Sequence, residues 1–121
     1  MTSRMENKGP YFIDFPARIK SIQAEMAKQK IDVYLGSRLR TLSWTLDAFC
    51  PWRSFVVIPA DGMPAAFSFV IDAARIADET WIDEDRVYGF VPMGGQDQIE
   101  LISDFIKDQM KGGRGRVGIE S

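Results

Sequence analysis

The sequence of 121 residues contains no histidine and only one cysteine, Cys50. Without histidine the chain cannot form a Ser-His-Asp or Cys-His relay, and it lacks the commonest side-chain ligand of transition metals. A single cysteine cannot form a disulfide within the chain, and a free thiol is typical of a reducing compartment. The sequence therefore argues against histidine-dependent catalysis in this chain, and we expect a cytoplasmic location.

Long apolar runs and an excess of basic residues are also missing. The longest nearly apolar runs, residues 54–59 and 65–71, are far shorter than the ~20 residues that span a bilayer. Residues 1–10 have no apolar stretch of the kind found in signal peptides. The 15 basic and 17 acidic residues give a net charge of −2, which does not favour phosphate backbones. We therefore expect neither a membrane nor a nucleic acid as partner.

The composition that remains is that of one ordinary globular domain, with 45% hydrophobic and 26% charged residues. A chain of this length buries roughly two-thirds of its unfolded surface, enough for a core without metal or disulfide support. The first residues are polar and show no periodicity. We therefore predict a flexible arm over residues 1–13 and a single domain over residues 14–121.

Apolar periodicity predicts alternating helices and strands. Apolar residues at helical spacing predict amphipathic helices over 16–30 and 97–110, and a brief helix that Ser37 caps. Asp14 is placed to cap the first helix. Residues 31–35 alternate as a strand, and the turn at residues 59–62 predicts a β-hairpin over 53–71.

The remaining segments are shorter. Residues 72–78 predict one or two helical turns, residues 81–82 and 87–91 one or two strands, and Val117 with Ile119 the start of a last strand. This order predicts an α/β fold: a three-layer sandwich with a mixed β-sheet that contains a β-hairpin, and helices on both faces.

Aromatic side chains and an arginine gather around a predicted loop, at Trp44, Phe49, Trp52 and Arg53. Aromatic residues and arginine anchor interfaces, and a guanidinium binds carboxylate groups. Packing in the core explains Trp44 and Phe49 well. All four are candidates for substrate capping or for an interface, and Trp52 and Arg53 are the preferred pair.

Three other patterns favour a structural reading over a chemical one. Gly113, Gly115 and Gly118 fit a G-x-G-x-x-G pattern, but they follow a helix and precede a strand, which inverts a dinucleotide site. Cys50 has only Arg53 as a nearby cation to lower its pKa, so a buried apolar role is favoured. The acidic residues lack the spacing of a calcium loop; they are Asp78, Glu79, Asp83, Glu84 and Asp85. No catalytic residue and no metal ligand is assigned.

The order of elements resembles the N-terminal domain of the creatinase, prolidase and aminopeptidase P family. The resembling segments are Arg18, Ile19, Ile22 and Met26 in the opening helix, Lys30 to Leu35, Leu42 to Thr45, the Arg53 to Pro64 strand and P-x-D-G-x-P hairpin, and Arg116 to Glu120. Two positions depart from the family pattern. Lys30 replaces a glycine, and Trp44 to Asp47 lacks the glycine of the family's tyrosine-leucine-threonine-glycine segment.

The resemblance implies a non-catalytic domain that ends at the junction to a C-terminal catalytic domain outside these residues. That catalytic domain would bind two divalent metal ions (Mn, Co or Zn) in a proline-specific peptidase, and none in a creatinase-like protein. The resemblance also implies a homodimer or higher homo-oligomer, in which the first domain caps the substrate site; by position, Trp52 and Arg53 match the family's loop residues.

Two other functions stay open from the sequence. The chain could be a free-standing protein-interaction module with no hydrolase domain. It could also be a small enzyme that uses carboxylates alone, although the spacing singles out no carboxylate pair.

Overall fold

The computed structural model describes residues 13–50, 53–91, 98–110 and 115–120. Of the predicted arm over 1–13, residues 1–12 lie outside the described residues. The candidate Trp52 lies outside them as well. The described elements are α2 (Phe15–Gln29), β1 (Val33–Gly36), α3 (Leu39–Leu46), β2 (Phe55–Pro59), β3 (Ala65–Phe69), α4 (Val70–Glu79), a 3₁₀ turn (Glu84–Arg86), β4 (Val87–Phe90), α5 (Gln98–Gln109) and β5 (Val117–Ile119).

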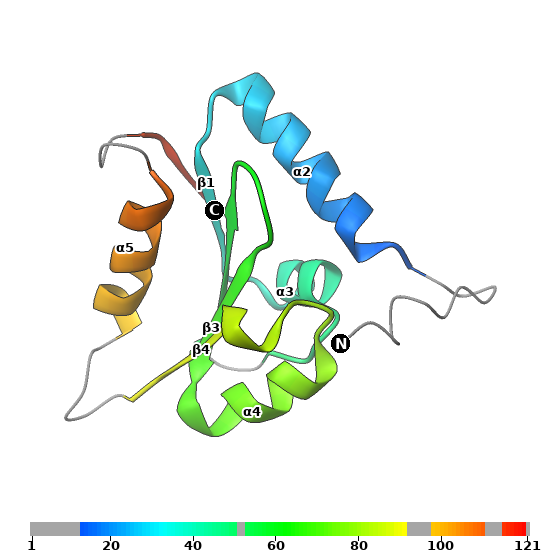
Figure 1. The fold of residues 1–121 in the computed structure, drawn as a ribbon, viewed down its shortest axis with the longest axis vertical. Helices are drawn as coiled ribbons and strands as arrows, with labels where there is room; N and C mark the ends of the chain where they lie inside the picture. The colour runs from blue at the N-terminus through cyan, green and yellow to red at the C-terminus, as the bar shows by residue number, and fades with distance from the viewer. Residues whose placement is uncertain (1–12, 51–52, 92–97, 111–114, 121) are drawn as a thin grey trace.

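The strands form one mixed sheet in the order β4-β3-β2-β1-β5 (Figure 1). The hairpin strands β2 and β3 are antiparallel, and β1 is antiparallel to β2, with Leu35 opposite Val57. The two outer strands are parallel to their neighbours: β4 pairs with β3, and β5 pairs with β1. The predicted mixed sheet with an internal hairpin is confirmed.

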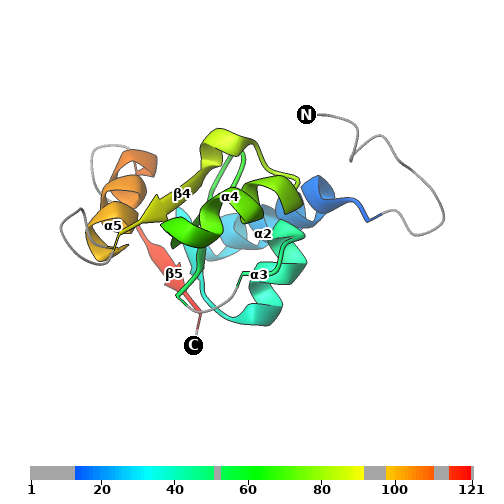
Figure 2. The same cartoon turned by 90° about the horizontal axis from the view of Figure 1, so that it is seen from below.

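Helices cover both faces of the sheet, which gives three layers (Figure 2). On one face, side chains of α2, α3 and α4 such as Met26, Leu42 and Ile76 pack against β2 and β3. On the other face, Ile102 of α5 packs against Phe67 and its neighbours. Because alternate residues of β2 point to opposite faces, this strand contributes to both clusters. The predicted three-layer sandwich is confirmed.

Helix α2 is capped at both ends by residues adjacent to it in the sequence. The Oδ1 atom of Asp14 accepts a hydrogen bond from the backbone N–H of Ala17 at 3.1 Å, as the sequence predicts. At the other end, Lys30 adopts a left-handed conformation with φ 58°, and its N–H bonds to the last turn. These local caps explain why the first helix is predicted within one residue at each end.

Of the one or two strands predicted over residues 81–82 and 87–91, the structure has one, β4, and the predicted hairpin ends earlier than expected. The strand predicted to continue to Ile71 ends at Phe69, because α4 starts at Val70 and its first turn lies against β4. Gly89 makes this approach possible, since a Cβ there would lie 2.9 Å from the Cα of Val70. Residues 81–82 form a bend rather than a strand, and the side chain of Trp81 bonds to α3 instead.

Candidate functional site

The candidate Trp44 lies on α3 with its side chain 43% exposed. The guanidinium of Arg18 from α2 lies over the indole, 4.5 Å from the ring centroid, and its Nη1 donates to the Trp44 carbonyl at 2.9 Å. A cation over an indole face is attracted by the ring quadrupole. This contact joins α2 to α3 and leaves part of the indole exposed.

Phe49 lies in the loop after α3, and the residue is 62% exposed. Its backbone N–H donates to the Oε1 atom of Glu79 at 3.0 Å, and the Arg75 guanidinium lies 5.8 Å from the ring centroid. Arg75 in turn pairs with Glu79 at 2.9 Å. Phe49 is therefore associated with α4, whereas Trp44 is associated with α2.

Arg53 is exposed and adopts a left-handed conformation with φ 58°. Its carbonyl accepts a hydrogen bond of 2.6 Å from Nε2 of Gln98, at the start of α5. The three candidates that the structure describes thus do not share one contact cluster: Trp44 lies near α2, Phe49 near α4 and Arg53 near α5.

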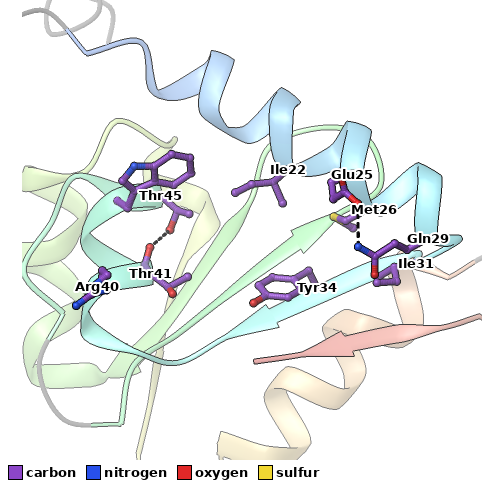
Figure 3. Close-up of a pocket in the computed structure, with 10 residues that line it drawn as sticks. Ile22, Glu25, Met26, Gln29, Ile31, Tyr34, Arg40, Thr41 and Thr45 are labelled. Carbon is purple, nitrogen blue, oxygen red and sulfur yellow. Dashed lines mark hydrogen bonds between the residues drawn. The ribbon is translucent and has the colours of Figure 1, made fainter. Parts of the chain in front are cut away.

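A groove of about 510 Å³ lies between α2 and α3, and sequence reasoning missed it. Its floor is Tyr34 of β1, whose ring lies across the space between the helices (Figure 3). Burial and the neighbouring Glu120 raise the pKa of Tyr34, so its hydroxyl stays protonated at neutral pH. The lining residues are Ile22, Glu25, Met26, Gln29, Ile31, Tyr34, Arg40, Thr41, Trp44 and Thr45.

Glycine at position 118 allows this floor to form. A Cβ at Gly118 would lie 3.2 Å from both the Ile31 and the Tyr34 side chains. The ring of Tyr34 therefore packs over the backbone of β5. The groove depends on the last strand as well as on the two helices.

Glu120 stabilises the first turn of α3 from the end of the last strand. Its Oε1 accepts the backbone N–H groups of Ser37 and Arg38 at 2.8 Å each, and its Oε2 accepts the hydroxyl of Thr41. Ser37 was predicted to cap this helix, and that prediction is wrong because the cap residue Arg38 makes no side-chain cap and the carboxylate of Glu120 takes the role. Sequence reasoning could not find this cap, since no local pattern links residues so far apart.

The same contacts determine the acidity of Glu120. Burial alone would raise the pKa of its carboxyl, but the hydrogen bonds from Thr41, Arg38 and Ser37 outweigh burial and leave the pKa below its usual range. The carboxylate is therefore ionised at neutral pH and complements the N-terminal end of the helix dipole.

The last carbonyls of α3 also bond to distant side chains. The Trp81 Nε1 donates to the carbonyl of Thr45 at 2.7 Å, and the Thr80 hydroxyl donates to the carbonyl of Leu46 at 2.5 Å. Both donors follow α4. Helix α3, which has 8 residues, thus has hydrogen-bond partners at both ends that are distant in the sequence.

Cys50 is a buried core residue. It packs in the cluster with Leu42, Leu46 and Ile76, and burial raises the pKa of its thiol to about 11. The cation that acts to lower the pKa of this thiol is Arg75 rather than Arg53. The burial of Cys50 among apolar side chains confirms the buried apolar position that the sequence predicts.

The acidic segment provides no metal site within the described ranges. Glu79 is paired with Arg75, and no three carboxylate, thiol or imidazole groups in the described part of the chain could together bind a metal ion. The residues present here therefore do not fit the paired metal ions that the resemblance places in a catalytic domain. The glycine pattern is likewise inverted, since Gly118 lies in β5 after α5, and Gly113 lies outside the described residues.

Solved structures identify the fold, whereas no family model and no curated protein matches the sequence. A proline dipeptidase from Streptococcus pneumoniae matches with a TM-score of 0.66 at 19% identity, over 85% of this chain and 73% of that chain. The N-terminal domain of the cytoplasmic peptidase PepQ from Mycobacterium tuberculosis matches with a TM-score of 0.65 at 15% identity, over 86% and 72%.

A third structure carries the family description. The creatinase/prolidase N-terminal domain of an X-Pro dipeptidase from Streptococcus pyogenes matches with a TM-score of 0.62 at 19% identity, over 73% of this chain and 70% of that chain. The chain has the fold of a creatinase/prolidase N-terminal domain. The resemblance noted from the sequence is thereby confirmed, and at these identities the likeness establishes the fold alone.

Proposed function

We propose that this chain is the non-catalytic N-terminal domain of a proline-specific peptidase or creatinase-like metallohydrolase. The fold carries the proposal, because the matched structures include N-terminal domains of an X-Pro dipeptidase and of the peptidase PepQ. Its partner is then a C-terminal catalytic domain of the same protein. Two divalent metal ions, Mn, Co or Zn, belong to that domain if the protein is a peptidase.

Within such a protein, this domain supports homo-oligomers and narrows the substrate site. The exposed ring of Phe49 and the exposed Arg53 support this role, together with Trp52 by its position in the sequence. An aromatic ring excludes water from an interface, and a guanidinium pairs with a substrate carboxylate. In the described part of the chain, no helix combines the length and apolar character that crossing a membrane requires. A buried free thiol at Cys50 supports a cytoplasmic location.

The test uses the protein that carries the catalytic domain. Arg53→Ala and Trp52→Ala should each lower kcat/KM for a proline dipeptide about tenfold, or reduce the oligomer mass measured by light scattering. Arg116→Ala is the matched control, because Arg116 is also exposed and lies on another segment. If both variants behave like the control in kinetics and in mass, the capping and interface assignment is wrong.

A second candidate is a free-standing module that binds a partner protein. Exposed apolar side chains favour it, since Ile71 is 83% exposed on α4 and Phe49 lies in the loop beside it. The two candidates differ in the effect of the Arg53 and Trp52 variants. Only the first predicts a change in peptidase kinetics.

A further inference from the structure

A hydrogen bond joins the beginning of α5 to the candidate Arg53. Nε2 of Gln98, the first residue of α5, donates to the carbonyl oxygen of Arg53 at 2.6 Å. The two residues are 45 positions apart, so the spacing in the sequence could not predict the contact. It fixes the backbone of a residue whose guanidinium the proposed function pairs with a substrate carboxylate.

The backbone of Arg53 adopts a conformation that needs support. Its φ of 58° lies in the left-handed region, which is unfavourable for a residue with a Cβ and persists only where the surroundings impose it. The next residue, the buried Ser54, supplies one constraint, because its hydroxyl hydrogen-bonds to that of Ser68 on β3 at 2.9 Å. Gln98 supplies a second constraint, from a helix rather than from the sheet.

Helix α5 is itself anchored to the sheet. Ile102 lies four residues after Gln98, on the same side of the helix, and is buried against Phe67 and its neighbours. The ring of Phe105 meets that of Phe67 edge-on, with the ring centroids 5.4 Å apart. The adjacent Ile99, in contrast, is 76% exposed. Gln98 therefore lies on the anchored side of α5, at a fixed position relative to the sheet.

We propose that Gln98 is a positioning residue for the guanidinium of Arg53. Its amide holds the carbonyl of Arg53 and thereby sets the direction in which the Arg53 side chain leaves the backbone. The guanidinium is then presented to the carboxylate of a proline dipeptide in one orientation rather than in several. This inference rests on the proposed function, in which Arg53 narrows the substrate site.

The test measures the kinetics of the protein that carries the catalytic domain, with Ala-Pro as the substrate. Gln98→Ala should raise KM about threefold and change kcat less than about twofold, because a misplaced guanidinium binds the substrate carboxylate less tightly. Gln98→Glu should show the same loss, since it keeps the length of the side chain but has no N–H to donate at neutral pH. A carboxylate is favourable in the first turn of a helix, so this variant should keep its fold. Gln109→Ala removes a half-buried glutamine from the other end of α5 and is the matched control, with an unchanged KM.

A double substitution decides whether Gln98 acts through Arg53. In the Arg53→Ala background, Gln98→Ala should change KM less than about 1.5-fold, since the guanidinium that it positions is absent. Additive effects, an unchanged KM in Arg53→Ala, or a Gln98→Glu variant that behaves like the natural protein would overturn the inference. If Gln98→Ala behaves like the control although Arg53→Ala lowers kcat/KM, only this inference fails. If Arg53→Ala and Trp52→Ala also behave like the control in kinetics and oligomer mass, the proposed function fails with it.

Discussion

Helices α2 and α3 lie side by side on the same face of the sheet, yet they are stabilised in different ways. Helix α2 has 15 residues and is capped by its own neighbours, Asp14 and Lys30. Helix α3 has 8 residues, and its ends bond to Glu120, Thr80 and Trp81. Because isolated helices shorter than ~12–15 residues are marginal in water, α3 depends on tertiary contacts. The α3 wall of the groove therefore depends on hydrogen bonds from Glu120, Thr80 and Trp81.

The largest effect is expected from the core side of α3. Leu42 is fully buried against the sheet, so Leu42→Ala should lower the free energy of unfolding by about 2–5 kcal/mol through lost burial and a cavity. The matched control is Leu39→Ala on the same helix, where the side chain is 57% exposed. Urea unfolding measures both. Similar losses in the two variants would show that α3 is not anchored by its buried face.

The cap from Glu120 comes next. Glu120→Ala removes the acceptor of three hydrogen bonds and should lower the free energy of unfolding by about 2–3 kcal/mol. Asp14→Ala at the local cap of α2 should lower it by only about 1 kcal/mol. Urea unfolding under one set of conditions compares the two variants. A larger loss in Asp14→Ala would reverse the comparison between the helices.

A smaller effect is expected at the other end of α3. Trp81→Phe keeps an aromatic ring but removes the donor to the Thr45 carbonyl, and it should lower the free energy of unfolding by about 1 kcal/mol. Hydrogen exchange of the α3 amides should rise more than that of the α2 amides. Equal increases in both helices would contradict a local role for this bond.

The smallest expected effect is the pH dependence of the stability that Glu120 contributes. Because the folded pKa of Glu120 lies below its unfolded value, its contribution is present above the usual glutamate pKa of about 4.3 and is lost as the pH falls through the folded pKa. Glu120→Gln lacks this contribution. The stability difference between the natural chain and Glu120→Gln should therefore shrink on acidification, and thermal melts from neutral pH to pH 3 measure it. A difference that stays constant would argue against an ionised cap.

This contrast also explains what could be predicted from the sequence. The local signals of α2, the hairpin turn at Asp61 and Gly62, and the periodicity of α5 predicted those elements. The cap of α3 could not be predicted, because Glu120 is 79 or more residues away from its partners. The groove between α2 and α3 was also missed, because its lining comes from two helices and a strand that are separated in the sequence. The order of the helices and strands predicted the α/β sandwich, the resemblance predicted the family's fold, and the matched structures confirm both.

Among the candidate residues, sequence spacing alone was a poor guide to proximity. Trp44 and Phe49 are close in the sequence but contact α2 and α4, respectively, because α3 ends between them. Arg53 lies beside Gln98 of α5. Their proposed role in capping or assembly remains a prediction for kinetics to test.

The most direct test of a non-catalytic role is an assay of the purified 121-residue chain with a proline dipeptide such as Ala-Pro, with and without added Mn²⁺ or Co²⁺. We predict that proline is released no faster than in buffer containing the same metal. Turnover that co-purifies with the folded chain and is lost on its denaturation would contradict the account.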